Sequence, residues 1–504
     1  MKKYMKCIAL LLSLSLLTVS FAGCRSSKGN ESGTDSDEFE WVYESGETGS
    51  DNNASGNGES NVSGNNAGTG SNAGGTTSQG NTLGGNGGGT TTSNVTTKGK
   101  TFTIISTYLS PKRTNGMDLY AELFLERAEE VEKELGCTIK IVNTVYPTPE
   151  WLAPQIQAGK KVADLLHVEM RQLVPFVSAG YVKAWSDVPS INVKQADFNQ
   201  GITKVSTING KTYALSMLKP EEVRYCGAIN KTLLKQYGIN PDDIYAKVNN
   251  GTWNFDALTE YATKLKNNDS FKGKAITATA DYLIEMLMAA NNGRIVTMNG
   301  DKATPTYNSN NVKTAANYMY DLVHKYNVYD PNGKGDFSKG NVGFYFCESW
   351  EFAKKMKPNV KSFDYAMIPV PKGPNASDYT SSLEHANIFM ITSTNKEEAF
   401  TAKVLTALAK APDKQSGNQW WLDEVQLDLF QKNDTQSMDV YKMLLNSASI
   451  DLGLCVPTLT TKFKDAVLKN AIVDNKTSVS AAFDSINGKL DGTINDVFKN
   501  IGKK

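Results

Sequence analysis

The chain has 504 residues, and its 53 Lys plus Arg are balanced by 53 Asp plus Glu, with only three His. This balance does not indicate a nucleic-acid partner. The few His and Cys are too scattered for a metal site, and no cofactor is expected. Without the leader and the polar stretch behind it, about 400 residues remain, which is too many for one compact core, so two lobes are expected.

The N-terminus has the pattern of an export signal. Three lysines in the first six residues precede an apolar run at 8–19, which is too short to cross a bilayer as a helix. Cys24 directly follows Ala-Gly and resembles the lipidated cysteine of bacterial lipoproteins, although Phe21 stands where leucine is usual. The resemblance implies a signal peptide at 1–23 and an acylated Cys24 (palmitate or a similar chain). An ordinary secretory signal is the alternative.

Residues 24–99 predict a flexible tether. They are rich in Gly, Ser, Asn and Thr and hold few aliphatic side chains, so they bury too little apolar surface to offset the entropy of ordering. A coil of this length has an r.m.s. span of roughly 45 to 50 Å. Such reach suits a protein anchored on the extracellular face of the cell membrane, and we expect a Gram-positive host.

Strands and helices alternate where the folded part begins. A strand is predicted at Thr101–Ser106, and a helix follows with Tyr120, Phe124, Ala128, Val131 and Leu135 on one face. After Gly136 come a strand at Cys137–Val142, a helix from about Glu150 and a strand at Asp164–Val168. This order predicts an α/β fold with parallel strands and helices on both faces of the sheet.

The ends of these strands indicate where a ligand binds. In open α/β sheets the ligand lies beyond the carboxyl ends of the strands. That rule selects residues 108–115 after the first strand, Tyr146 after the second, and Glu169 to Arg171 after the third.

Six short motifs follow one another in five passages, at 208–239, 252–256, 337–350, 363–374 and 387–399. The first passage holds two of them, INGKTYAL and AINK followed by LKQYGI. In this order the motifs resemble those of bacterial extracellular solute-binding protein family 1, the group that includes maltose-binding protein. The resemblance covers the chain from about residue 100 to the C-terminus. Two departures, Cys226-Gly-Ala before Asn-Lys and Leu383-Glu-His385 in place of glycines, affect the expected ligand and not the fold.

The resemblance implies a type II periplasmic-binding-protein-like fold, in which each of two lobes is a mostly parallel sheet flanked by helices. Lobe one is expected at 100–217 and 369–420, and lobe two at 220–367 and 421–504. Hinge crossovers are expected near 216–220 and 368–371. It also implies a monomeric, non-enzymatic protein that binds a small carbohydrate and delivers it to the permease subunits of an ABC importer.

Sugar pockets combine a flat aromatic ring for the C–H face with polar side chains for the hydroxyls. From this chemistry together with the positions that the resemblance implies for ligand contacts, the expected ligand-binding residues are Trp350, Glu348, Glu169, Arg171, Tyr282, Glu384 and His385. A core position for Trp350 is the alternative. Trp253 is expected to be structural, at a helix start that Thr252 caps, and Lys112 and Arg113 are interpreted as solvated unless the ligand is acidic.

Other functions stay open at this point. The same fold would serve a surface receptor or adhesin that feeds a sensor, and a peptide or acidic sugar is an alternative ligand. A glycoside hydrolase needs two carboxyl groups about 5 to 10 Å apart, which sequence spacing neither shows nor excludes. The four cysteines beyond Cys24 are expected to be buried, with one disulfide left open: Cys137, Cys226, Cys347 and Cys455.

Overall fold

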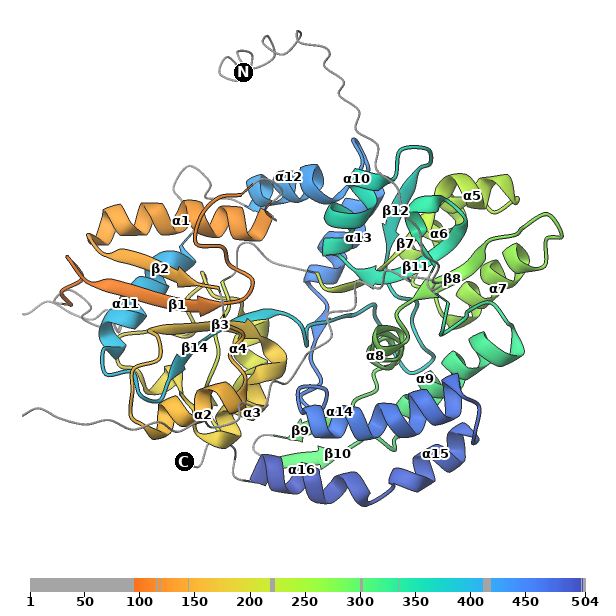
Figure 1. Ribbon diagram of the computed structural model, residues 1–504. Coiled ribbons are helices and arrows are strands. Elements are labelled where there is room, and N and C mark those ends of the chain that lie inside the picture. Colours follow the sequence, from red (N-terminus) through yellow and green to blue (C-terminus); the bar gives the residue numbers. More distant parts are fainter. Residues whose placement is uncertain are drawn as a thin grey trace, which may run out of the picture. The chain divides into compact units, whose positions relative to one another are not determined.

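The computed structural model describes residues 95–501, apart from 115–116, 118, 144, 218–222, 300–301, 334, 411–417 and 500. The predicted signal peptide, Cys24 and nearly all of the predicted tether lie outside these residues. Thr97, three residues before the predicted start of the folded part, is buried, and its hydroxyl donates to the Leu135 carbonyl. The described part contains two main sheets, each with its own helices (Figure 1).

The first sheet has the strand order β2-β1-β3-β14-β4. Its strands are β1 (Thr101–Ser106), β2 (Thr138–Val142), β3 (Leu165–Glu169), β4 (Val182–Lys183) and β14 (Asn387–Thr392). Its helices are α1 (Leu119–Leu135), α2 (Pro149–Gln157), α3 (Leu173–Ala179), α4 (Gln200–Val205) and α11 (Glu398–Ala409), and β5 (Thr207–Ile208) pairs with β6 (Lys211–Thr212). The elements predicted between residues 101 and 169 are confirmed to within one or two residues.

Buried apolar side chains alternate along the strands between the two faces of this sheet, which explains why helices cover both faces. Phe102 and Ile104 of β1 belong to the cluster that contains the α1 and α11 side chains, whereas Ile105 belongs to the cluster with α3. Successive strand residues point to opposite faces. The side chains of α1 and α11 therefore pack on one face of the sheet and those of α2 and α3 on the other.

The second sheet has the order β12-β7-β11-β8. Its strands are β7 (Tyr225–Asn230), β8 (Lys274–Ala278), β11 (Val342–Glu348) and β12 (Tyr365–Ile368). The helices before β12 are α5 (Lys231–Gln236), α6 (Pro241–Asn249), α7 (Phe255–Lys266), α8 (Ala280–Ala290), α9 (Asn310–Tyr320) and α10 (Lys357–Asn359). The later helices are α12 (Asn418–Leu429), α13 (Thr435–Leu445), α14 (Pro457–Phe463), α15 (Val479–Ile486) and α16 (Lys489–Lys499).

Two smaller strand pairs accompany this sheet. The antiparallel pair joins β9 (Val296–Asn299) to β10 (Lys302–Pro305), and the parallel pair joins β13 (Ser381–Ser382) to β15 (Ala448–Ser449). The β13 to β15 pairing connects the segment before β14 to the C-terminal part of the chain. It therefore lies on the path by which the chain returns to the first sheet.

Both main sheets are mixed, because one strand in each runs against all the others. In the first sheet β14 is antiparallel to both of its neighbours, and in the second β7 is antiparallel to both of its neighbours. Each of these strands is the first main-sheet strand after the chain crosses from the other lobe. Such a strand begins where its neighbours end, so residues at its amino end join residues at their carboxyl ends.

The second crossing lies later than residues 368–371. The Lys372 and Gly373 amides still donate to carbonyls of Trp253 and Ala290 in the second lobe. Contact with the first lobe begins where Arg171 and Met170 donate to the carbonyls of Glu384 and Ala386. Most of the other expected hinge, 216–220, lies outside the described residues.

Two tryptophans illustrate the core. Trp253 is fully buried as expected, and its indole N–H donates to the Pro369 carbonyl at 2.9 Å. The expected cap is wrong, because α7 begins at Phe255 and its N-cap is Asn254, whose side chain accepts from the Ala257 amide. Trp185 is likewise fully buried and donates to the Phe389 carbonyl.

Candidate functional site

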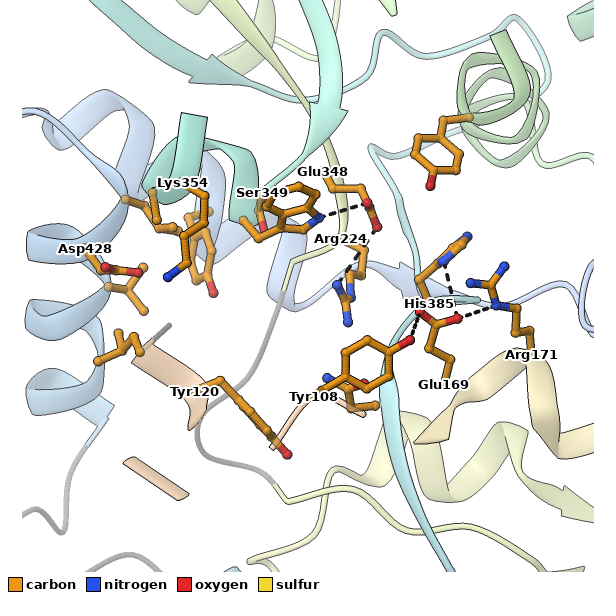
Figure 2. A pocket seen from close by; sticks show the side chains of 18 residues that line it. Tyr108, Tyr120, Glu169, Arg171, Arg224, Glu348, Ser349, Lys354, His385 and Asp428 are labelled. Carbon is orange, nitrogen blue, oxygen red and sulfur yellow. Dashed lines mark hydrogen bonds and ion pairs between the residues drawn. The ribbon is translucent and has the colours of Figure 1, made fainter. Parts of the chain in front are cut away.

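A cavity of about 380 Å³ lies where strands of both main sheets end or begin (Figure 2). Its lining comes from the first lobe, the second lobe and the helices after residue 418. The lining residues are Tyr108, Leu119, Tyr120, Glu169, Arg171, Arg224, Tyr282, Glu348, Ser349, Trp350, Ala353, Lys354, His385, Asn387, Val425, Asp428, Leu429 and Tyr441.

Glu169, the last residue of β3, is the centre of a polar cluster on the first-lobe wall. The Tyr108 hydroxyl donates to its Oε1 at 2.5 Å, and Arg171 Nε donates to its Oε2. His385 Nδ1 lies 3.8 Å from the same Oε2. Figure 2 shows these side chains converging on one carboxylate.

Strand register brings this cluster together. Ser106 of β1 is level with His167 of β3, so the segments that follow both strands meet at one edge, and Glu169 is level with Asn387 at the start of β14. Behind the wall, His167 lies between the hydroxyls of Ser106 and Tyr120. Burial, and then the charge of Arg224, lowers the pKa of His167 to about 3, so this histidine is a neutral core residue.

The electrostatics of the cluster favour an ionised Glu169. Burial alone raises the pKa of this carboxyl, but the adjacent His385, the charge of Arg171 and the Tyr108 hydroxyl outweigh burial and hold the pKa at about 2. Burial, and then the Glu169 charge, raises the pKa of Tyr108 far above its usual value. Tyr108 therefore stays a hydroxyl donor.

Glu348, Trp350 and Arg224 form the second-lobe wall. Glu348 ends β11, and its Oε2 accepts from Trp350 Nε1 at 2.9 Å. Arg224 Nη1 lies 3.9 Å from Glu348 Oε1, and Lys355 Nζ lies 5.0 Å from the centre of a Trp350 ring. The hydrogen bond fixes the tilt of the indole.

Trp350 differs from the core tryptophans in exposure. It is 40% exposed, whereas Trp185 and Trp253 are fully buried. Within the described residues, Trp350 and Leu427 are the large apolar side chains that are exposed. The core reading of Trp350 is therefore wrong, and its ring is available to a ligand.

Two acceptor atoms of the cavity have no hydrogen-bond partner in the described part of the chain. They are Glu348 Oε1 and Asn387 Oδ1, and both residues are buried to more than nine-tenths. Each atom is able to accept a hydrogen bond from a ligand hydroxyl. Tyr282 adds a donor, because burial, and then the charge of Glu348, raises its pKa to about 12.

The cavity brings together six of the seven residues expected to bind the ligand, namely Trp350, Glu348, Glu169, Arg171, Tyr282 and His385. Glu384 is not among the lining residues. It is 2% exposed, and its carboxylate accepts from the Ser382 hydroxyl and the Asp451 amide instead. Both residues lie in a turn in which the Ala386 amide donates to the Leu383 carbonyl at 2.9 Å, and of the two only His385 lines the cavity.

Other sequence expectations lie outside the cavity. Tyr146 does not line it, although its hydroxyl accepts from Gln172 Nε2 at 3.2 Å. Arg113 pairs with Glu129 at 2.6 Å, and both side chains are half exposed. Lys112 is exposed as well.

Sequence reasoning missed several lining residues. Arg224 and Asn387 adjoin or begin β7 and β14, the strands that run against their neighbours. A rule based only on the carboxyl ends of strands does not select them. The residues from α12 and α13 (Val425, Asp428, Leu429 and Tyr441) gave no sequence signal, since only the fold carries them to this cavity.

Several chemical features are absent from the described part of the chain. No group of three or more His, Cys, Asp or Glu residues there is placed to hold a metal ion. Its four cysteines, Cys137, Cys226, Cys347 and Cys455, are buried and have free thiols, as expected for small core residues. No helix in the same residues combines the length and apolar character needed to cross a membrane.

Residues 113–416 match the family of the bacterial extracellular solute-binding proteins. The match covers more than half of the chain, which therefore belongs to this family, a group of non-enzymatic binding proteins of ABC transport. The arabinooligosaccharide-binding protein of Bacillus subtilis is 25% identical over 231 residues, 45% of this chain. The match spans half the length of that relative.

Solved structures share the two-lobed periplasmic binding protein fold. The cyclic α-maltosyl-1,6-maltose binding protein of Arthrobacter globiformis gives a TM-score of 0.59 at 15% identity, covering 79% of this chain and 99% of that one. UgpB of Mycobacterium tuberculosis, solved with glycerophosphocholine, gives 0.57 at 15% identity, covering 78% and 98%. At these identities the similarity shows the fold alone.

Proposed function

We propose that this protein captures a sugar or oligosaccharide between its two lobes and delivers it to an ABC importer. The observation that carries the proposal is Trp350, a half-exposed indole on the cavity wall that is tied through Nε1 to Glu348. A sugar ring stacks its C–H face on such an indole while its hydroxyls reach polar side chains at the edge. Glu348 Oε1 and Asn387 Oδ1 supply acceptors for those hydroxyls.

The charges of the cavity favour an uncharged ligand. Three acidic and three basic side chains line it: Glu169, Glu348, Asp428, Arg171, Arg224 and Lys354. Arg171 is paired with Glu169, and Arg224 lies near Glu348. An acidic sugar or a charged peptide would have to compete with these internal pairs, whereas a neutral sugar accepts and donates hydrogen bonds without separating them.

Two walls from two lobes suggest how the ligand is held. Glu169 belongs to the first lobe and Trp350 to the second, so a ligand that contacts both is bound fully only when the lobes are together. A ligand shifts the equilibrium toward the state in which it makes more contacts, and hinge closure between domains is a common way to do so. We propose lobes centred on the two main sheets, joined where the chain enters β7, near residues 384–387, and between α11 and α12.

The experiment is a calorimetric titration of the full chain with arabinotriose, maltotetraose, galacturonic acid and glycerophosphocholine. We expect a neutral oligosaccharide to bind wild type and to bind Trp350→Ala about thirtyfold more weakly, a loss of about 2 kcal/mol. Trp253→Phe is the matched control, which changes a buried tryptophan and is expected to retain affinity. Equal binding by wild type and Trp350→Ala would refute the site, and binding of galacturonic acid alone would refute the neutral ligand.

We further propose that Cys24 carries a lipid that holds the protein on the outer face of the cell membrane. The sequence pattern around Cys24 supports this anchor. An anchored receptor stays near its importer, and the long polar segment after Cys24 provides reach. Detergent phase partition of wild type and Cys24→Ser tests the anchor, because an unlipidated Cys24 would leave both proteins in the aqueous phase.

A further inference from the structure

The segment from Ser381 to Asn387 carries the chain from the second lobe back to the first. On the second-lobe side, the Ser381 hydroxyl donates to the Tyr225 carbonyl at 3.1 Å, and the Leu383 amide donates to the Ser449 carbonyl at 2.9 Å. On the first-lobe side, Met170 donates to the Ala386 carbonyl at 2.8 Å. The change of partner falls between Leu383 and Ala386.

Glu384 lies at this change and contacts both lobes. Its carbonyl accepts from the Arg171 amide at 3.0 Å in the first lobe. Its side-chain Oε1 accepts from the Asp451 amide at 2.7 Å in the second lobe, and its Oε2 accepts from the Ser382 hydroxyl within the segment. One buried residue therefore ties both lobes together at the crossing.

Two cavity residues that follow Glu384 in the chain, His385 and Asn387, depend on the position of its backbone. His385 packs its ring against Tyr282 and Tyr225 at centroid distances of 5.6 and 6.0 Å and lies 3.8 Å from Glu169 Oε2. Asn387 presents an unpartnered Oδ1. A shift of the backbone at Glu384 would move both side chains.

The Glu384 carboxyl has other acidic side chains around it. Asp451 accepts from the amides of Ile295, Val296 and Gly453, and Arg294 is nearby. On α8, Glu285 accepts from the Tyr225 hydroxyl at 2.8 Å and pairs at 2.7 Å with Lys464. The titratable groups that interact electrostatically with Glu384 are Asp451, Glu285, Tyr225 and Cys455. Arg294 and Lys464 are the basic groups beside Asp451 and Glu285, and the first-lobe side carries Arg171, Glu169 and His385.

We propose that Glu384 is a positioning residue, whose carboxyl fixes the interlobe crossing so that His385 and Asn387 are presented to the ligand. The proposal rests on the proposed function only for its effect on affinity. The hydrogen bonds from the Asp451 and Arg171 amides to Glu384 exist in the protein without ligand. The positioning role is therefore testable without a ligand.

Three substitutions separate the hydrogen bonds from the charge. Glu384→Gln keeps an acceptor for the Asp451 amide and offers Ser382 an N–H partner, but it carries no charge. Glu384→Asp keeps the charge and is one methylene too short to keep the 2.7 Å contact. Glu384→Ala removes both hydrogen bonds. Asp164→Ala is the matched control, since Asp164 is also buried and accepts a backbone amide, that of Thr103 at 2.9 Å, where the chain enters β3 at the end away from Glu169.

The experiment is hydrogen–deuterium exchange of the full chain without ligand, followed by titration with arabinotriose and maltotetraose. We expect faster exchange at the Asp451 and Arg171 amides in Glu384→Ala and Glu384→Asp, with affinity about tenfold weaker. Glu384→Gln and Asp164→Ala are expected to match wild type at both amides and in affinity. The proposal is overturned if both amides exchange at the wild-type rate in Glu384→Ala and Glu384→Asp. If Glu384→Ala does not fold, the result for Glu384→Asp decides alone.

A pH profile adds a separate check that the Glu384 carboxyl is buried at the crossing. Burial raises the pKa of the Glu384 carboxyl to about 7. A raised folded-state pKa gives stability that is present below the unfolded pKa and is lost as pH rises through the folded value. Relative to Glu384→Gln, the Tm of wild type should therefore fall as pH rises from about 4.5 to 7. Parallel Tm profiles of the two proteins would contradict a raised pKa at Glu384. If neither sugar binds wild type, the proposed function fails while the exchange experiment still decides the role of Glu384.

Discussion

The two walls of the cavity carry one key carboxylate each, and these carboxylates differ in how their oxygens are used. Both oxygens of Glu169 are engaged, by Tyr108 on one side and by Arg171 and His385 on the other. Glu348 uses Oε2 to hold Trp350, while its Oε1 has no hydrogen bond from a described residue. Both residues are buried, with 7% and 5% exposure.

This difference indicates that Glu169 and Glu348 have different roles. A carboxylate whose oxygens are all engaged fixes the positions of its partners and has little capacity left for a ligand. A buried carboxylate oxygen that accepts no hydrogen bond is stabilised by a ligand hydroxyl, because an unsatisfied buried acceptor costs about 1 to 3 kcal/mol. We therefore expect Glu169 to act mainly on stability and Glu348 mainly on affinity.

The largest expected effect is on stability, from Glu169→Gln. A carboxyl whose pKa falls from its ordinary value of 4.5 to about 2 on folding stabilises the protein by about 3 kcal/mol above pH 5. Because the pKa is depressed, this stability is lost as pH falls from about 4.5 toward 2. Urea unfolding of wild type and Glu169→Gln at pH 7 and pH 3 measures it. A difference that is equally large at both values would contradict a charge-based role.

A smaller effect, on affinity, is expected from Glu348→Gln. The amide oxygen still accepts from Trp350, but the free carboxylate oxygen becomes an N–H₂ group that a ligand hydroxyl meets as a donor. We expect binding of the neutral oligosaccharide to weaken about tenfold, or about 1.4 kcal/mol, with little change in unfolding. Calorimetry on this variant and on Glu169→Gln sharpens the comparison. If Glu169→Gln loses more affinity than Glu348→Gln, the division between the two walls is wrong.

The smallest effect is expected from Arg113→Ala. This side chain pairs with Glu129 outside the cavity, and both are half exposed. Exposed pairs of this kind contribute at most about 1 kcal/mol. We expect stability and sugar affinity to stay near wild type in the same measurements. A selective loss of galacturonic acid binding would restore the acidic-sugar interpretation and place Arg113 at the ligand.

Much of the fold was predictable because its local signals agree. The α1 face, the glycine that ends it and the strands on either side follow from periodicity and turn chemistry, and these elements lie where predicted. Sheet direction was less predictable. β7 and β14 look like any buried strand, and their reversed direction depends on which lobe the chain has just left.

The site was predictable to the same extent and for the same reason. Glu169, Arg171, Glu348 and Trp350 follow or end strands, so the rule about carboxyl ends selects them. Arg224 and Asn387 belong to amino ends and escape that rule. Glu384 was misplaced, because sequence adjacency to His385 says nothing about which of the two side chains turns toward the cavity.

Composition and contacts within a few residues were enough to predict the signal-like leader, the family resemblance, the α/β alternation and the chemistry available for a ligand. Only the tertiary structure shows which carboxylate is fully partnered, which has an oxygen without a hydrogen bond, and which is buried at the crossing. Those properties depend on groups far apart in the chain, such as Glu384 and Asp451 or Glu169 and His385. Burial and partners, rather than residue type, set what each carboxyl does.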